Sequence, residues 1–343
     1  MVRKVKKKKS GIRLFVALPL LVVIAAFVYK SIMTLGTPSI FEKEYDDKTS
    51  SYSSLKIKLN PTVSISPDKL KSPNAILIRL EVRGYTSPDK PVSQVGGMSP
   101  TNTILMQKNS EEKIYPASLT KIMTAIVALE KLPDLKKEIK LTHSTFQGLY
   151  GADASMAGFQ PGEQVRAIDL LYGVMLPSGA ESCIGLADQI AGSEQNFVKL
   201  MNQKAAALGM KNTHFANVTG LHNANHYTTV KDLAILLSYA LQNDTYREIF
   251  TSSRHSIPPT NKHPGGITFY STLFEDLHDL SFTSGEILGG KTGYTKEAGL
   301  CLASLAKVGK QEYILISAGA KGDHHSEQYN ITDALAVYNS IEK

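Results

Sequence analysis

The stretch YPASLTKIMTA, residues 115–125, places a serine and a lysine three positions apart at the start of a helix. Apolar residues recur at helical spacing from Ser118 onward, and Pro116 stands just ahead of the first turn. Residues three apart on a helix face the same way, so the hydroxyl of Ser118 can meet the amine of Lys121. Lysine can remove the serine proton once its pKa falls from about 10.4 toward 7, a shift that burial and a nearby cation both favour.

Two later stretches carry further polar groups. LPSGAE, residues 176–181, reads as a turn between two predicted helices, and GGKTGYT, residues 289–295, precedes a predicted strand. Each motif alone has an ordinary structural explanation. Ser-x-x-Lys occurs seven times in the chain, a serine at 118 or 178 can cap a helix, and a lysine at 291 can be solvated. Glycines on a strand edge, however, let the backbone of a ligand approach closely.

The pattern of predicted elements indicates an α/β fold. Strands at both ends of the body and helices between them predict one sheet built from both termini with a helical insertion. The predicted strands are 75–82, 104–107, 299–307 and 311–318, and the predicted helices begin at 118 or span 167–175, 182–190, 193–208, 232–241 and 332–342.

The net charge of +7 comes from the amino terminus. Residues 1–13 contain seven of the 38 Lys and Arg and no acidic residue, so the remaining chain is balanced against its 31 Asp and Glu. This distribution argues against a nucleic-acid-binding face. Residues 14–29 carry no charge, and Lys30 can snorkel, so we expect a basic cytoplasmic tail at 1–13 and a transmembrane signal anchor at 14–35. A cleaved signal peptide is the alternative, with a poor cleavage site near 34–36.

Beyond the anchor, residues 36–73 are rich in Ser, Thr, Asp, Lys and Pro and predict an extracellular stalk. The folded domain is then expected at 74–343, outside a single-pass cell membrane. Cys183 and Cys301 stand in apolar contexts and are expected to be free and buried.

The three motifs, in this order and with Ser118, Ser178 and Lys291 separated by 60 and 113 positions, resemble those of the penicillin-recognising serine peptidases. The sequence most resembles the low-molecular-weight D-alanyl-D-alanine carboxypeptidases of peptidase family S11, from about 75 to 320. The similar stretches also include PGEQVRAIDLLYGVMLPSGAES (161–182) and FANVTGLHNANHYTTVKDLA (215–234). The resemblance implies a β-lactamase/transpeptidase-like α+β fold, an antiparallel sheet flanked by helices, with a helical subdomain at about 120–260 and the site between them.

The resemblance also implies a reaction. Ser118 would attack the carbonyl between the two terminal D-alanines of a peptidoglycan stem pentapeptide, Lys121 would act as general base, and Ser178 would relay a proton to the leaving amine. Water would then hydrolyse the acyl-enzyme. β-Lactam antibiotics would acylate the same serine, and no cofactor or metal is implied.

Substrate binding would fall to the third motif. Lys291 and Thr292 would hold the terminal carboxylate, and Lys291 would help to lower the pKa of Lys121. Gly293 and Tyr294 would complete this binding edge, with the backbone N–H groups of Ser118 and Tyr294 forming an oxyanion hole.

One position departs from the family. The second motif is usually Ser-x-Asn, and here the third position is Ala180, whose methyl cannot hold the lysine or the substrate amide. Glu181 or another polar group is expected to compensate. The departure keeps open a weakened or non-catalytic module that binds cell-wall peptide.

Other hydrolases are weaker alternatives. A class A β-lactamase needs a Glu-x-x-Leu-Asn stretch after the second motif, and none occurs between 182 and 290. A zinc carboxypeptidase would need a third ligand beside His222 and His226, and the pair at 324–325 is flanked by flexible residues. Transpeptidation is open, because the choice of acceptor depends on the shape of the cleft. The chain ends within about twenty residues of the similar region, so we expect attachment through the amino-terminal helix.

Overall fold

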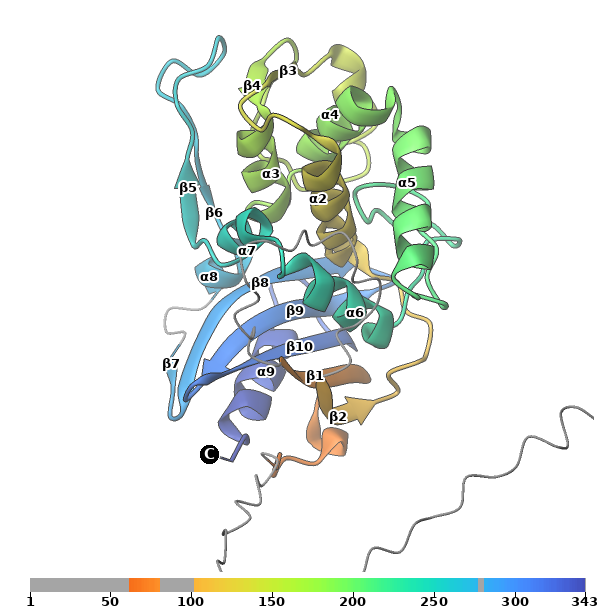
Figure 1. The fold of residues 1–343 in the computed structure, drawn as a ribbon, viewed down its shortest axis with the longest axis vertical. Coiled ribbons are helices and arrows are strands. Elements are labelled where there is room, and N and C mark those ends of the chain that lie inside the picture. Colours follow the sequence, from red (N-terminus) through yellow and green to blue (C-terminus); the bar gives the residue numbers. More distant parts are fainter. Residues whose placement is uncertain (1–61, 81–101, 277–280, 343) are drawn as a thin grey trace, which may run out of the picture. The chain divides into compact units, whose positions relative to one another are not determined.

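The computed structural model describes residues 62–80, 102–276 and 281–342 (Figure 1). The tail expected at 1–13, the anchor expected at 14–35 and the first part of the expected stalk, 36–61, lie outside these residues. Within the described ranges, no helix is both long enough and apolar enough to cross a membrane.

A six-stranded antiparallel sheet forms the centre of the fold, in the strand order β2-β1-β10-β9-β8-β7. Its strands are β1 (Asn74–Leu80), β2 (Thr103–Lys108), β7 (Ser281–Phe282), β8 (Gly285–Thr295), β9 (Gly299–Val308) and β10 (Gln311–Ala320). Because β1 pairs with β10, with Ile76 opposite Ile316, the two ends of the chain build one sheet. This is the sheet that the order of predicted elements indicated.

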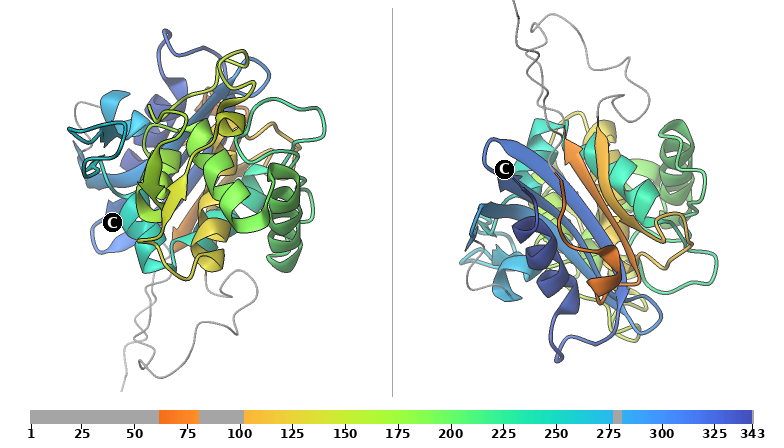
Figure 2. Two further views of the ribbon diagram at one scale, coloured as in Figure 1. Left: turned by 90° about the horizontal axis from the view of Figure 1, so that it is seen from above. Right: turned by 90° about the horizontal axis from the view of Figure 1, so that it is seen from below.

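The sheet separates two apolar cores. Side chains alternate between faces along a strand. In β1, Ile76 and Ile78 join the core beneath the helical part, whereas Leu77 joins the core beneath α9 (Tyr329–Asn339). Figures 1 and 2 show α9 on one face of the sheet and the other long helices on the opposite face. Strand β8 therefore presents alternate side chains to the helical part, where the motifs gather.

The helical part surrounds α2 (Thr120–Lys131), whose residues 120–128 are all buried. Its other elements are η3 (Ala117–Leu119), η4 (His143–Phe146), α3 (Ala167–Met175), α4 (Ala180–Ala191), α5 (Glu194–Ala207), α6 (Val230–Ala240), α7 (Asp244–Phe250) and α8 (Thr272–Asp276). Two short hairpins, β3–β4 (Glu138–Lys140, Gln164–Arg166) and β5–β6 (Arg254–Ser256, Thr268–Tyr270), lie at its edge. Because α2 is buried from its first residue, its first turn is held rigidly. Ser118 lies directly before that turn.

The end of the expected stalk is part of the folded body. Val63 forms an antiparallel bridge with Ile341, and residues 67–69 form a 3-10 turn, η1. The carboxylate of Asp333 in α9 accepts hydrogen bonds from the backbone N–H groups of Lys71 and Ser72, at 2.9 and 2.7 Å. Residues 62–73 therefore pack against the carboxyl-terminal helix and do not lead away from the domain, which corrects the boundary expected at 74.

Candidate active site

The first motif places its serine and lysine side chains in contact. Ser118 lies in η3, half-buried, and Lys121 lies in the first turn of α2. The amine Nζ of Lys121 donates to Ser118 Oγ at 3.0 Å and to the carbonyl oxygen of Thr219 at 2.7 Å. The pairing predicted from the spacing is present in the structure.

The environment of Lys121 favours the neutral amine. Its side chain is 3% exposed, and burial lowers its pKa from the ordinary value. Cys183 and Glu181 oppose that shift, because negative charge on either group would favour the ammonium. Burial is the larger effect, so the lysine is suited to accept a proton.

The lysine of the third motif faces the same region. Lys291 in β8 pairs with Ala303 in β9, which belongs to the core beneath the helical part, so Lys291 points to that face. It is 1% exposed, and its amine donates to the carbonyl oxygen of Thr292 at 2.9 Å. Burial, followed by the positive charge of Lys121, lowers the pKa of Lys291 well below its ordinary value. The positive charge of Lys121 therefore lowers the pKa of Lys291. The expected lowering of the Lys121 pKa by Lys291 remains a prediction.

Gly293 lets β8 approach Ser118 closely. A Cβ built at Gly293 would lie 3.0 Å from the backbone nitrogen of Ser118 and 3.3 Å from Cβ of Ala117. A side chain of any size would therefore force the strand away from η3. Tyr294 follows on the strand, and its ring meets the edge of the His324 ring at a centroid distance of 4.9 Å. Sequence reasoning had considered His324 only as a metal ligand.

The second motif presents a buried hydroxyl, that of Ser178. Ser178 is 3% exposed, and its Oγ has no hydrogen-bond partner among the residues that the structure describes. Its backbone is left-handed, with φ of 65°. The turn is fixed by the N–H of Gly179, which donates to Gly173 O at 2.8 Å, and by the N–H of Ala180, which donates to Ser155 O at 2.8 Å. A buried, unbonded hydroxyl in a strained residue is typical of a functional position.

Thr272 links the second motif to the third. Its backbone N–H donates to the carbonyl oxygen of Leu176 at 3.2 Å, and its hydroxyl lies 2.6 Å from that of Thr292. No sequence pattern marks Thr272, because its partners are 96 and 20 positions away.

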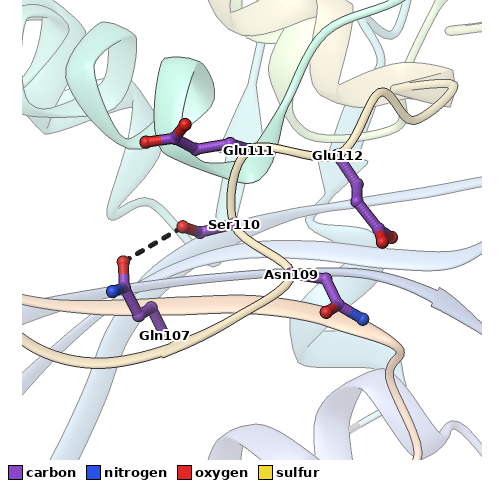
Figure 3. A pocket seen from close by; sticks show the side chains of 5 residues that line it. All are labelled: Gln107, Asn109, Ser110, Glu111 and Glu112. Carbon is purple, nitrogen blue, oxygen red and sulfur yellow. Dashed lines mark hydrogen bonds between the residues drawn. The ribbon is translucent and has the colours of Figure 1, made fainter.

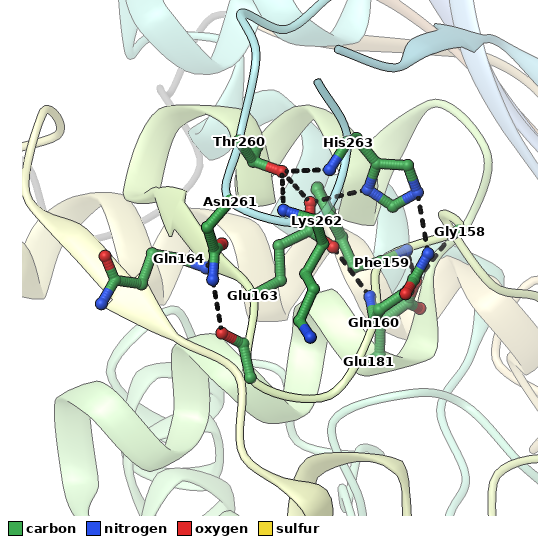
Figure 4. Close-up of polar contacts among 11 residues, drawn as sticks. Gly158, Phe159, Gln160, Glu163, Gln164, Glu181, Thr260, Asn261, Lys262 and His263 are labelled. Carbon is green, nitrogen blue, oxygen red and sulfur yellow. Dashed lines mark hydrogen bonds and ion pairs between the residues drawn. The ribbon is translucent and has the colours of Figure 1, made fainter. Parts of the chain in front are cut away.

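Glu181 holds the backbone of residues 157–159 beside the second motif (Figure 4). Its Oε1 accepts hydrogen bonds from the backbone N–H groups of Ala157, Gly158 and Phe159, at 2.7, 2.9 and 3.3 Å. Its Oε2 is buried without a partner in the described part of the chain, and burial raises its pKa. This carboxylate therefore holds backbone, whereas the further contact to the Lys121 amine comes from Thr219.

A second buried carboxylate, that of Glu163, holds the other end of the 157–164 segment (Figure 4). Glu163 Oε2 accepts from the backbone N–H of Gln160 at 2.8 Å, and Oε1 lies 2.6 Å from the hydroxyl of Thr260 and 2.8 Å from Nδ1 of His263. These contacts tie the 157–164 segment to the loop between β5 and β6.

The histidines of the zinc alternative have other partners. Within the residues described, no three His, Cys, Asp or Glu side chains are grouped as metal ligands. His226 is bonded to Thr120, and the ring of His222 packs edge-on against Tyr115 at 4.8 Å. Both cysteines are free and buried, as expected.

An open hollow of about 570 Å³ lies elsewhere, at the end of β2. Figure 3 shows its five lining residues, Gln107, Asn109, Ser110, Glu111 and Glu112. None belongs to the motifs, and the hydroxyl of Ser110 donates to Gln107 at 3.1 Å. The hollow is therefore separate from the candidate site.

Known proteins of one family are similar in sequence to this chain. A family model described as D-alanyl-D-alanine carboxypeptidase, Peptidase_S11, matches residues 98–322. The D-alanyl-D-alanine carboxypeptidase DacF of Bacillus subtilis is 37% identical over 224 residues, covering 64% of this chain and 55% of the relative. DacC of Escherichia coli is 36% identical, with coverages of 64% and 54%. The chain thus spans about half the length of these two relatives.

A solved structure shows the same fold. The crystal structure of the Streptomyces K15 DD-transpeptidase superposes with a TM-score of 0.67 at 25% identity, covering 80% of this chain and 98% of that one.

Proposed function

Because the chain belongs to the D-alanyl-D-alanine carboxypeptidase family, peptidase S11, we propose that it is a serine-type carboxypeptidase that removes the terminal D-alanine from peptidoglycan stem pentapeptides. The observation that carries the proposal is the contact between the buried amine of Lys121 and the hydroxyl of Ser118, at 3.0 Å.

Acylation begins at that contact. The neutral amine of Lys121 takes the proton of Ser118 as the serine oxygen bonds to the carbonyl carbon between the two D-alanines. Negative charge then develops on the carbonyl oxygen, where the N–H groups of Ser118 and Tyr294 stabilise it. The C–N bond breaks, the terminal D-alanine leaves, and the rest of the stem remains as an ester on Ser118.

The leaving amine needs a proton as that bond breaks. The hydroxyl of Ser178 is buried and unbonded among the described residues, so it can pass a proton from Lys121 without losing a contact of its own. Water then attacks the ester, the serine recovers its proton, and the shortened stem is released.

The terminal carboxylate of the substrate fits the third motif. Lys291 carries a lowered pKa in the free protein because it is buried beside Lys121. A bound carboxylate would favour the ammonium form of Lys291 and would offset the repulsion from Lys121. A β-lactam carries a carboxylate and a strained carbonyl, so it acylates Ser118 through the same contacts.

We also propose that the domain acts at the outer face of the cell membrane. The support is the sequence alone: the basic stretch at 1–13 and the uncharged stretch at 14–29 are typical of a signal anchor, which would bring the site to the cell wall.

The test is release of D-alanine by the full-length chain from a stem pentapeptide that ends in D-Ala-D-Ala. Release that is lost in Ser118→Ala and is retained with a chelator supports the proposal. Binding of the pentapeptide without release would contradict it and favour the non-catalytic module. Rapid hydrolysis of a chromogenic cephalosporin would favour a β-lactamase.

A further inference from the structure

The residue before the nucleophile has a constrained backbone. Ala117 adopts a left-handed conformation with φ of 46°, which costs an L-residue about 1–2 kcal/mol. Its carbonyl oxygen is packed against Gly220, where a Cβ would lie 1.9 Å away. The conformation persists because surrounding groups hold that carbonyl in place.

A chain of hydrogen bonds reaches the carbonyl from a buried histidine. The hydroxyl of Thr120 donates to Ala117 O at 2.8 Å and lies 2.7 Å from Nε2 of His226. The backbone N–H of Ala216 donates to Nδ1 of His226 at 3.1 Å, which assigns the ring proton to Nε2. His226 therefore donates to Thr120, and Thr120 donates to Ala117.

These hydrogen bonds also fix the N–H of Ser118, which lies on the other side of the same peptide unit. A trans peptide is planar, and its C=O and N–H point in opposite directions. The carbonyl of Ala117 and the N–H of Ser118 belong to one peptide unit, so fixing the carbonyl fixes the direction of the N–H. Hydrogen bonds to the carbonyl also polarise the unit and strengthen the N–H as a donor.

We propose that His226 is a positioning residue that, through Thr120, orients the Ala117–Ser118 peptide so that the Ser118 N–H points at the developing oxyanion. The inference rests on the proposed function in taking Ser118 as the nucleophile. His226 suits the task because it is buried, packs edge-on against Phe215 at 5.6 Å and lies on a segment remote from Thr120 in sequence.

The experiment measures, in the full-length chain, the acylation rate with a fluorescent penicillin and the affinity for a peptide boronate, whose tetrahedral adduct carries the oxyanion. We expect His226→Ala to lower both by about 10–100-fold, a part of the loss seen when an oxyanion donor is removed. The KM for the pentapeptide should change little, because the ground-state contacts remain. His226→Gln, whose amide can still donate to Thr120, should recover most of the rate.

Thr120→Val tests the same hydrogen bonds at their middle residue, since it removes the hydroxyl and keeps the volume of the side chain. The double variant should be no slower than the slower single one, because both act through one chain. His214→Ala is the matched control, an exposed histidine on the same segment. If His226→Ala does not fold, as judged by thermal unfolding, Thr120→Val and His226→Gln carry the test.

The outcomes separate this inference from the proposed function. If the wild-type chain is not labelled by the penicillin, the proposed function fails. If the wild type is labelled and folded His226→Ala and Thr120→Val match its rate and boronate affinity, His226 does not position the peptide. Losses that add in the double variant would also overturn the inference.

Discussion

The amine of Lys121 lies 3.0 Å from the hydroxyl of Ser118 and is held at the same time by the carbonyl of Thr219 at 2.7 Å. A neutral amine has two N–H donors and one lone pair. One donor satisfies Thr219, and the lone pair can accept the hydroxyl proton of Ser118. The lysine is therefore held against the hydroxyl of Ser118 before any substrate arrives.

Acylation should depend on pH through Lys121. Because burial lowers the pKa of this lysine, the neutral, reactive form appears below the ordinary value near 10.4. The acylation rate with a fluorescent penicillin should rise with pH and level off before that value. A profile that still rises steeply around pH 10.4 would show that Lys121 titrates like an exposed lysine and is not the base.

Removing the nucleophile should abolish covalent labelling. Ser118→Ala leaves no oxygen to form the ester, so a fluorescent penicillin should give no covalent band. Ser110→Ala is the matched control, because Ser110 and Lys113 have the same spacing but lie outside the candidate site. Labelling that persists in Ser118→Ala, or that disappears in Ser110→Ala, would rule out the assignment.

Ser178→Gly should separate activity from stability. Glycine adopts positive φ without the cost to an L-residue of about 1 kcal/mol, and the hydroxyl that it removes has no partner among the described residues. Release of D-alanine should fall by about 100-fold, as for loss of a proton-transfer group. The midpoint of thermal unfolding should stay equal or rise. A large fall in stability with unchanged turnover would instead indicate a structural serine.

The central pairing of the site could be predicted from sequence because its parts are local or carry distinctive motifs. Ser118 and Lys121 are one helical turn apart, and the helix at 167–175 was predicted with the bounds of α3. The long strands β9 and β10 were also located to within two residues, since each is a long apolar run before or after a Gly-containing turn.

What sequence missed depends on contacts between distant residues. Thr272 meets Thr292, and His226 meets Thr120 across 106 positions, and no periodicity marks either pair. The strands of the hairpins β3–β4 and β5–β6 have three residues each, too few to show an alternation. Residues 62–73 look like a stalk because their few apolar side chains, such as the buried Leu70, find partners only in the folded domain.

Gly293→Ala should slow acylation more than it destabilises the fold. The added Cβ would lie 3.0 Å from the backbone nitrogen of Ser118, so β8 or η3 must move by a few tenths of an ångström. Misplacement on that scale at an oxyanion hole should cost about 10-fold in acylation rate. Gly151→Ala is the control, because its Cβ would lie in open surroundings, 3.8 Å from the nearest heavy atom. Equal rates for the two variants would show that the strand edge does not need to lie against the nucleophile.

Acid should destabilise the domain through His226. Burial, with smaller contributions from His214 and His222, lowers the pKa of this imidazole from 6.5 to about 4. Between pH 4 and 6.5 the imidazole is protonated in the unfolded chain and neutral in the folded chain. The contribution of His226 to the free energy of unfolding is therefore complete above pH 6.5 and is lost as pH falls toward 4. Integrated over that window, the loss is about 3 kcal/mol. Protonation would also put a hydrogen on Nδ1 against the N–H of Ala216, which breaks that hydrogen bond and leaves the donation from Nε2 to Thr120 in place.

Urea unfolding of the wild type and of His226→Gln at pH 7.5 and pH 4.5 measures this contribution, because glutamine does not titrate in that range. The wild type should lose more stability than the variant between the two values, by a difference of about 2–3 kcal/mol. His143→Gln is the control, since this exposed histidine is not among the groups that shift the pKa of His226 and should leave the difference unchanged. If the wild type and His226→Gln lose equal stability, the buried imidazole is not kept neutral in the folded domain.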